Sequence, residues 1–325
     1  MALSDSNPSS EPTELTLVIP LRNEAGELVP LIAEVQQVLD PIDITYAVLL
    51  VDDGSSDATW ATIQALASED RRVAGIQLSR NFGKEAALIA GLSEASGRAV
   101  LTMDGDGQHP PEKLPEFIEQ WRSGADIVEG MKLSRTTQSF LGRQASKLFN
   151  RCFSRLSEID LDEASDFRLL SRRAVDTLLS LPESAFFYRG LSSWIGFNRS
   201  RVTFVPAHRR GGRSSFSSWT LAKYAVKNTI AFTSAPLQLV TIAGFVFLFF
   251  ALVLGAQTLW QWYAGRAVEG FTTVILLILI QGGVVMMALG LIGQYIAQIH
   301  NEVKGRPRFL IQASTRSEAD ARCKD

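Results

Sequence analysis

Two long stretches without charged residues restrict the architecture of this chain more than any other feature of its sequence. No Asp, Glu, Lys or Arg occurs between Lys227 and Arg266, and none occurs between Glu269 and Glu302. The apolar runs inside these stretches are residues 235–260 and 271–299. A helix that crosses a bilayer needs about 20 apolar residues, whereas helices buried in a soluble core are usually shorter and keep a polar face. The sequence therefore predicts two transmembrane helices, with a pair of buried helices as the alternative.

The distribution of basic residues predicts how these helices are oriented. Basic side chains flank the outer ends of the two runs, namely Lys223, Lys227, Lys304, Arg306 and Arg308. The connecting loop has only Arg266, beside Glu269. Because Lys and Arg concentrate on the cytoplasmic side of membrane proteins, we expect both outer ends in the cytoplasm, at the inner or plasma membrane. The aromatic residues Trp260, Trp262 and Tyr263 are expected at one membrane interface.

The same pattern predicts the domain organisation. Residues 1–13 are polar and lack the apolar core of a signal peptide, so we expect a disordered tail. Residues 14–212 are expected to form a cytoplasmic domain, and residues 213–230 an amphipathic segment at the membrane surface. The two membrane helices then occupy residues 231–300, and residues 301–325 form a cytoplasmic tail.

Charge and cysteine content exclude some classes of function. The net charge of −2 provides no concentrated basic face, so nucleic-acid binding is not expected. The two cysteines, Cys152 and Cys323, lie far apart in the sequence and form no CxxC motif. They indicate a reducing compartment and no zinc site.

The predicted cytoplasmic domain alternates strand-like and helix-like segments. Short apolar runs predict strands at residues 15–20, 45–53, 72–79, 99–106 and 125–131. Helical spacing predicts helices at residues 24–39, 57–70, 83–97 and 111–124, with Asp57 as an N-cap and Gly97 as a C-cap. This order is typical of an α/β fold with a mainly parallel sheet covered by helices. Ligands of such sheets bind at the carboxyl ends of the strands.

Polar residues follow four of these strands directly. The segments are "PLRNE" at residues 20–24, "DDGSSD" at 52–57, "SRNFGKEAA" at 79–87 and "DGDGQHPP" at 104–111. Any one of them alone is ordinary turn chemistry, since Asp, Gly, Ser and Asn dominate turns. Four such loops at one edge of one sheet instead predict a single cleft.

Asp104 and Asp106 are the candidate metal ligands in this cleft. Carboxylates suit hard cations such as Mg²⁺ and Mn²⁺, which bind proteins through one or two carboxylates plus the phosphates of a substrate. Gly105 and Gly107 leave the approach to the two carboxylates open. The chain contains neither a G-x-G-x-x-G motif nor a P-loop motif, which disfavours dinucleotide and P-loop sites.

These motifs resemble those of family 2 glycosyltransferases, which have a GT-A (Rossmann-like) fold. The resemblance is carried by "LVIPLRNE", "LLVDDGSSDAT", "SRNFGKEAALIAGL" and "MDGDGQHPP", in this order. The downstream segments "SDFRLLSRRAV" and "RRGGRSSFS", followed by two spans, narrow it to the polyprenyl-phosphate glycosyltransferases. Within that group the chain is most similar to bactoprenol glucosyltransferases of the GtrB type, and more distantly to dolichyl-phosphate mannose synthase.

The resemblance implies a role for each matching position on the donor side. The donor nucleotide would be bound by Pro20, Arg22, Glu24, Asp52, Asp53, Lys84, Asp104 and Gly105. The Mg²⁺ or Mn²⁺ ion would be held by Asp104, Asp106 and Gln108. Asp104 and Asp106 would take part in catalysis through this metal.

The resemblance also implies the acceptor side of the site. Asp166, in "SDFRLL", matches a position with a catalytic role, and pairing with Arg168 at a turn is its alternative interpretation. The phosphate of the acceptor lipid would be bound by Lys132, Arg168, Arg209, Arg210, Arg213, Ser214 and Ser215. Lys132 stands where the family often has arginine, and Ser215 replaces a family lysine. A lipid phosphate has a second pKa near 6 and is already a nucleophile, so Asp166 is expected to orient the acceptor or metal more than to remove a proton.

The reaction implied is transfer of a sugar from a nucleotide sugar to polyprenyl phosphate, with inversion at C1. Glucose from UDP-glucose is the expected donor, and mannose from GDP-mannose is the alternative. One alternative is a processive polysaccharide synthase, but such an enzyme would carry a Q-x-x-R-W motif, which is absent from this sequence. The other alternative is a non-catalytic membrane scaffold, which would not need the aspartates Asp52, Asp104, Asp106 and Asp166. The glycines in residues 281–293 can bring membrane helices close together, so a homo-oligomer is also expected.

Overall fold

The chain folds into two compact units in the computed structural model, which describes residues 13–133, 164–182, 188–207, 235–265 and 271–316. The first unit holds a β-sheet with the helices that cover it, and the second holds two long helices near the C-terminus.

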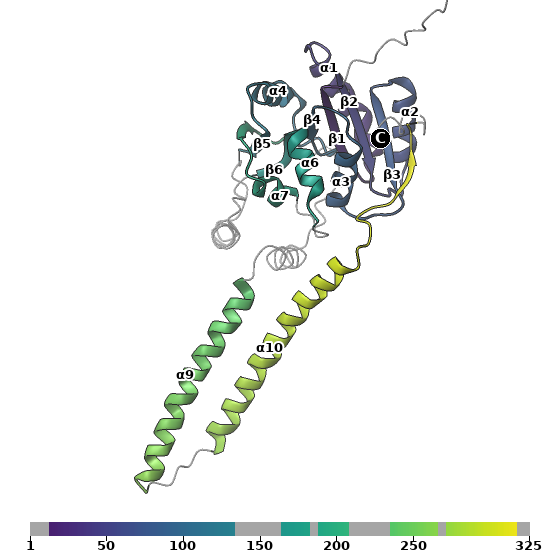
Figure 1. Ribbon diagram of the computed structural model, residues 1–325. Helices are drawn as coiled ribbons and strands as arrows, with labels where there is room; N and C mark the ends of the chain where they lie inside the picture. Colours follow the sequence, from purple (N-terminus) through teal and green to yellow (C-terminus); the bar gives the residue numbers. More distant parts are fainter. Residues whose placement is uncertain (1–12, 134–163, 183–187, 208–234, 266–270, 317–325) are drawn as a thin grey trace, which may run out of the picture. The chain divides into compact units, whose positions relative to one another are not determined.

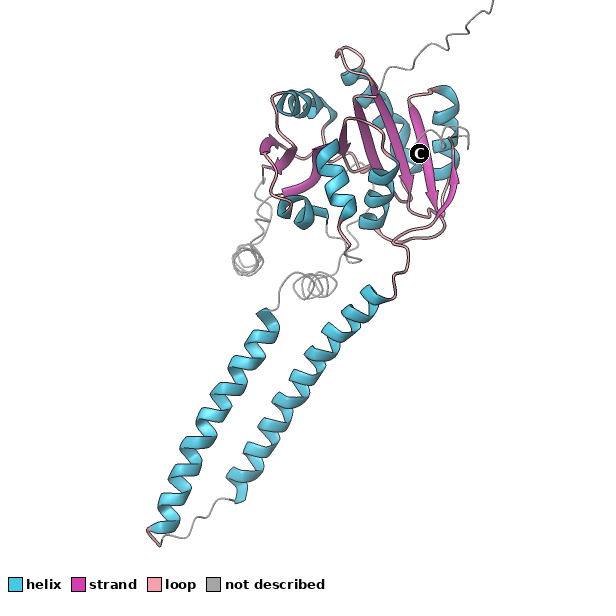
Figure 2. Cartoon of the chain, viewed as in Figure 1, coloured by secondary structure: helices cyan, strands magenta, loops and turns pink. Residues whose placement is uncertain are grey.

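The described part of the first unit forms one sheet of eight strands (Figure 2). The strands are β1 (Leu15–Leu21), β2 (Tyr46–Asp52), β3 (Val73–Leu78), β4 (Ala99–Thr102), β5 (Ile127–Lys132), β6 (Ala164–Ser171), β7 (Arg199–Phe204) and β8 (Ile311–Ser314). Their order across the sheet is β7-β5-β6-β4-β1-β2-β3-β8. The β4-β1-β2-β3 portion is parallel, as is the β5–β7 pair, while β6 and β8 run antiparallel to their neighbours. The predicted mainly parallel α/β fold is therefore confirmed.

Helices cover both faces of this sheet (Figure 1). They are α1 (Ala25–Leu39), α2 (Thr59–Glu69), α3 (Lys84–Glu94), the 3-10 turn η1 (Pro111–Lys113), α4 (Leu114–Arg122), α6 (Arg172–Ser180) and α7 (Tyr188–Trp194). Alternate residues of a strand point to opposite faces. Leu17 and Ile19 of β1 share a core with the apolar side chains of α1 and α4, whereas Val18 faces α3 on the other side.

Two helix ends differ from their predicted positions. α3 ends at Glu94, so Gly97 is not its C-cap. A Cβ atom at Gly97 would lie 2.7 Å from the Thr16 nitrogen, which shows that this glycine allows a close approach to β1. α2 begins at Thr59, with Ala58 in the N-cap position. Asp57 still accepts a hydrogen bond from the Thr59 nitrogen, at 3.0 Å, and thereby satisfies a donor at the helix start.

The chain returns to the sheet after its second long helix. β8 pairs with β3, placing Ser314 opposite Ile76, and the Thr315 hydroxyl accepts from the Gly75 nitrogen at 2.8 Å. Residues 301–325 were expected to form only a tail, because a four-residue strand carries too little periodicity to be predicted. This segment covers what would otherwise be an open sheet edge at β3.

The second unit contains α9 (Ala235–Tyr263) and α10 (Phe271–Val303), which contact each other. Each contains a segment long and apolar enough to cross a membrane, Val240–Gln261 and Ile280–Val303. Neither segment is buried within the structure, and Phe249 and Met287, for example, are exposed. Exposed apolar faces of this length do not fit the alternative of helices buried in a soluble core.

Close packing of α3 on the sheet leads to a testable prediction. A Cβ atom at Gly91 would lie 2.2 Å from Val18 and 3.1 Å from Val51, so Gly91→Ala forces the helix away from the sheet. We expect a loss of about 1–3 kcal/mol in the free energy of unfolding, measured by thermal or denaturant unfolding. Gly26→Ala is the matched control, because a Cβ there meets nothing within 4 Å. Equal stability of the two variants would contradict this packing.

Candidate active site

The loops that follow the first three strands are joined by hydrogen bonds at one edge of the sheet. Asn23, in the left-handed region with φ of 54°, donates its backbone N–H to the Ser55 hydroxyl at 2.9 Å. Asp53 accepts from the backbone N–H groups of Phe82 and Gly83, at 2.7 and 3.0 Å. These bonds link the ends of β1, β2 and β3, as the pattern of polar loops predicts.

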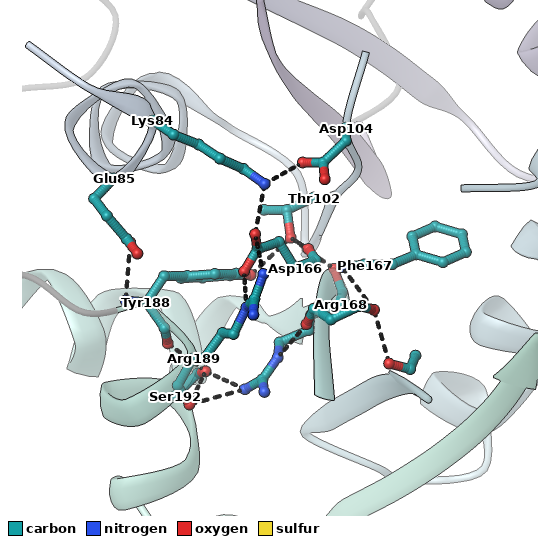
Figure 3. A network of polar contacts seen from close by, with 12 residues as sticks. Lys84, Glu85, Thr102, Asp104, Asp166, Phe167, Arg168, Tyr188, Arg189 and Ser192 are labelled. Atoms are coloured by element: carbon teal, nitrogen blue, oxygen red, sulfur yellow. Dashed lines mark hydrogen bonds and ion pairs between the residues drawn. The ribbon is translucent and has the colours of Figure 1, made fainter. Parts of the chain in front are cut away.

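Lys84 connects this edge to two carboxylates from other strands (Figure 3). Its Nζ lies 2.5 Å from Asp104 Oδ1, after β4, and 2.5 Å from Asp166 Oδ2, in β6. Arg189 of α7 donates from Nε to Asp166 Oδ1 at 2.6 Å and from a terminal nitrogen to Oδ2 at 2.9 Å. Lys84 and Arg189 therefore both bind the Asp166 carboxylate. Lys84 also binds Asp104, in the loop of the candidate metal ligands.

The register of β4 and β6 explains why the two carboxylates meet. Thr102 lies opposite Arg168, in an antiparallel pairing that continues back to Ala99 opposite Ser171. Extending that register by two residues sets Asp104 opposite Asp166. The Thr102 hydroxyl strengthens the pairing at this point by donating to the Asp166 carbonyl at 2.6 Å.

The electrostatics of this cluster stabilise the ionised forms. Burial alone would raise the pKa of Asp166, but the hydrogen bonds from Arg189 and the charge of Lys84 lower it far below its usual range. Burial likewise opposes charge on Lys84, yet Asp104 and Asp166 raise the Lys84 pKa. Asp166 is thus a carboxylate throughout the neutral range, and its lowered pKa makes it a weak base.

Two buried hydroxyl groups, those of Thr102 and Tyr188, lie next to the backbone of Asp166. The side chain of Tyr188 is fully buried, and its hydroxyl lies 2.8 Å from the Thr102 hydroxyl. Because Thr102 has one hydroxyl hydrogen, which it donates to the Asp166 carbonyl, Tyr188 is the donor of this second bond. The backbone nitrogen of Tyr188 donates to Glu85 Oε2 at 3.0 Å. Tyr188 of α7 is therefore bonded to both β4 and α3.

His109 holds the shape of the loop that carries Asp104 and Asp106. Its Nδ1 accepts from the Asp104 nitrogen at 2.9 Å, and its ring stacks on Phe167 with centroids 4.9 Å apart. Burial lowers the pKa of His109 to about 4, so the ring is neutral, which matches its role as an acceptor at Nδ1. Gln108 adds a second local bond by donating its backbone N–H to Asp106 Oδ1 at 3.1 Å.

Gly105 and Glu24 bring the first and fourth loops together. A Cβ atom at Gly105 would lie 2.4 Å from Glu24 Oε2 and 2.4 Å from Leu21, so only glycine fits there without displacing one of them. Among the described residues, no group of three or more His, Cys, Asp or Glu side chains is arranged to hold a metal by itself. Asp104 and Asp106 still offer the one or two carboxylates that Mg²⁺ needs when substrate phosphates complete its shell.

The remaining donor-side candidates lie at the same edge in different environments. Asp52 is fully buried, and its oxygens accept from the Ser55 nitrogen at 2.9 Å and the Gln77 side chain at 3.0 Å. Pro20 is buried within β1, whereas Arg22 is exposed just after it. Arg22 is close enough to Asp53 for its charge to act on the Asp53 pKa, which burial raises.

On the acceptor side, Lys132 and Arg168 have different surroundings. Lys132 ends β5, and burial lowers its pKa while the charges of Asp104 and Asp106 act in the opposite direction. Arg168 is fully buried, lies 3.3 Å from Glu129 and donates to the Ser165 carbonyl at 3.1 Å. Such burial does not fit the predicted contact of Arg168 with an acceptor phosphate. Asp166 also pairs with Arg189 and Lys84, not with Arg168.

The other predicted acceptor residues lie outside the described part of the chain. These are Arg209, Arg210, Arg213, Ser214 and Ser215. Their predicted role in phosphate binding stays a prediction.

Sequence reasoning assigned no role to three residues of this cluster. Arg189, in "AFFYRGLSSWIG", is a single basic residue in an apolar segment, and such an isolated charge is a usable signal for an ion pair with a buried carboxylate. Glu85 and His109 carry no comparable signal. Glu85 is one acidic residue in a helix, and His109 is one imidazole in a polar loop.

Comparison with known proteins places these features in a family context. Residues 16–179 match the model of glycosyl transferase family 2. The bactoprenol glucosyl transferase of Shigella phage SfII is 36% identical over 309 residues, which are 93% of this chain and 99% of the phage protein. An uncharacterised glycosyltransferase of Synechocystis is 35% identical over 300 residues, covering 92% of this chain and 94% of that protein.

Solved structures support the fold. The glucosyl-3-phosphoglycerate synthase of Mycobacterium tuberculosis, crystallised with Mn²⁺, UDP and phosphoglyceric acid, superposes with a TM-score of 0.50. It is 20% identical, and the match covers 67% of this chain and 78% of the synthase. At this identity the likeness concerns the fold alone.

The role of His109 can be tested with two complementary variants. His109→Phe keeps a ring against Phe167 but leaves the Asp104 N–H without its acceptor, at a cost of about 1–3 kcal/mol. His109→Asn retains an acceptor near the position of Nδ1 but loses the ring stacking. We expect faster amide hydrogen exchange across residues 104–108 in His109→Phe than in His109→Asn, although both variants melt at a lower temperature. Equal exchange in the two variants would show that the hydrogen bond does not order the loop.

Proposed function

The chain belongs to glycosyl transferase family 2, and on this premise we propose that it transfers glucose from UDP-glucose to a polyprenyl phosphate. The observation that carries the proposal is the bridge formed by Lys84 between Asp104, in the candidate metal loop, and Asp166, in β6. Through this bridge, the donor-side carboxylate of Asp104 lies close to the carboxylate of Asp166, which Arg189 also binds. Such an arrangement suits a reaction in which two phosphorylated molecules must meet.

The lipid acceptor is supported by features outside the cluster. α9 and α10 each contain an apolar segment of membrane-spanning length. The bactoprenol glucosyl transferases of Shigella phages SfII and SfV, both 36% identical to this chain, are named for a lipid acceptor. A membrane hairpin would keep the enzyme at the surface where such a lipid presents its phosphate. We place both outer ends of the hairpin on the cytoplasmic side, as the basic residues predict.

The proposed reaction is a direct displacement. An oxygen of the lipid phosphate forms a bond to C1 of glucose as the bond from C1 to the diphosphate breaks, and UDP leaves with inversion at C1. Asp104 and Asp106 would hold Mg²⁺ or Mn²⁺ with the diphosphate, and the metal supplies neutralisation of the charge on the leaving group. Lys84 lies beside Asp104 and can donate to the same phosphates.

Asp166 acts in this proposal as a positioning carboxylate. Its pKa is lowered by Arg189 and Lys84, so it has little tendency to take a proton. The lipid phosphate, with a second pKa near 6, is largely ionised at neutral pH and needs no base. Asp166 instead holds Arg189 and Lys84 in fixed positions, where their remaining donors can face an acceptor phosphate.

A homo-oligomer built through the glycines of α10 stays an additional prediction.

A donor screen tests the proposed function directly. Purified full-length protein is incubated with undecaprenyl phosphate, Mg²⁺ or Mn²⁺, and UDP- or GDP-sugars, and the lipid-linked product is measured. We expect turnover with UDP-glucose that EDTA abolishes and that Asp104→Asn lowers by on the order of a hundredfold or more. Asp43→Asn, at an exposed position in the loop between α1 and β2, is the control for surface charge. Turnover only with GDP-mannose, or with no sugar at all, would overturn the assignment of UDP-glucose.

A pH profile of Asp166→Asn separates positioning from general-base catalysis. We expect turnover to fall by on the order of a hundredfold at every pH, because the amide cannot hold Arg189 and Lys84 as the carboxylate does. The wild-type rate should rise as the lipid phosphate ionises near pH 6 and then stay level. If Asp166→Asn loses activity at neutral pH but recovers it at high pH, Asp166 is a base.

A further inference from the structure

Glu85 is the carboxylate of this cluster that the proposed chemistry leaves without a role. It is the second residue of α3, directly after Lys84, and its side chain extends toward the first residue of α7 (Figure 3). Its Oε2 accepts the backbone N–H of Tyr188 at 3.0 Å, across a separation of 103 residues.

This contact joins two helices that are far apart in the sequence. Its donor is the backbone N–H of Tyr188 in α7, and its acceptor is the side chain of Glu85 in α3. A backbone N–H in a buried setting that loses its acceptor costs about 1–3 kcal/mol, so this bond resists separation of the two helices. Glu85 thus fixes the distance between its own part of α3 and the Tyr188 backbone of α7.

The residues adjacent to this contact are the two cations that hold Asp166. Lys84 precedes Glu85 in α3, and Arg189 follows Tyr188 in α7. The hydrogen bond therefore joins the residue after Lys84 to the residue before Arg189, and it ties together the two backbone segments that carry these cations. The Tyr188 hydroxyl, bonded to Thr102, anchors the same residue to β4, the strand next to the one that carries Asp166.

We propose that Glu85 is a positioning residue for the transfer, which keeps Arg189 and Lys84 in register on the two oxygens of Asp166 by holding α7 against α3. This inference rests on the proposed function, since its consequence is a fixed carboxylate and two fixed cations at the acceptor. It assigns Glu85 no contact with substrate or metal.

The surroundings of Glu85 indicate which property of its side chain matters. Burial and the charge of Asp166 raise the pKa of Glu85 to about 7, while the Tyr188 N–H, Arg189 and Lys84 act in the opposite direction. Negative charge on Glu85 is thus costly at this position. The property that holds α7 is the Oε2 atom as a hydrogen-bond acceptor for the Tyr188 N–H. Glutamine retains an acceptor oxygen at the same reach, whereas aspartate retains the charge but is one methylene too short.

The test compares Glu85→Gln, Glu85→Asp and Glu85→Ala in the full-length protein. We expect Glu85→Asp and Glu85→Ala to lower kcat tenfold to about a hundredfold, with the KM for UDP-glucose changed less than about threefold. Glu85→Gln should stay within about threefold of the wild-type kcat. Glu69→Ala, at the exposed end of α2, is the control. If Glu85→Ala does not fold, the contrast between Gln and Asp still decides. An active Asp variant with an impaired Gln variant, or wild-type kcat in all three, overturns the proposal.

A second measurement needs no turnover. Amide hydrogen exchange across residues 188–194 should accelerate in Glu85→Asp and Glu85→Ala, and should match the wild type in Glu85→Gln and Glu69→Ala. Unchanged exchange in Glu85→Asp and Glu85→Ala overturns the inference even if the donor screen succeeds. Conversely, a failed donor screen with accelerated exchange shows that Glu85 holds α7 and that the proposed substrate is wrong.

Discussion

The ionised carboxylate of Asp166 is the constraint on which the rest of this site depends. A buried charge is stable only when opposite charges and hydrogen bonds replace the water it has lost. Lys84 and Arg189 provide that replacement, and they come from α3 and α7, which are far apart in the sequence. The sheet must therefore bring β6 beside β4, and both helices must lie on the same face of the sheet.

Strand register turns this requirement into a defined geometry. The antiparallel insertion of β6 next to β4 carries Asp166 to the position opposite Asp104, at the edge where the parallel strands end. A shift of one residue would turn the Asp166 side chain to the opposite face of the sheet, toward the core occupied by Phe167. Hydrogen bonds from Thr102 and the stacking of His109 on Phe167 hold this register on either face.

Sequence reasoning succeeded where a local signal was sufficient. Alternating apolar runs located the five strands from β1 to β5, and the polar loops after the first four located the edge that contains the cluster. Arg168 was expected to bind phosphate, because an arginine beside a catalytic aspartate looks accessible in a linear sequence. The fold instead buries Arg168 against Glu129, so its side chain pairs with a residue of β5 and is not open to a ligand.

The sequence by itself determined the presence of two membrane-length helices, the mainly parallel sheet and the identity of the acidic residues at its edge. These features follow from composition and short-range periodicity, which act over one element at a time. Only the tertiary structure decided that Arg189 and Lys84 share Asp166, that Glu85 binds the Tyr188 backbone of α7 and that β8 returns to the sheet. Each of these is a contact between residues far apart in the chain. Strand order and packing select which residues meet, and no single segment of the sequence carries information about either.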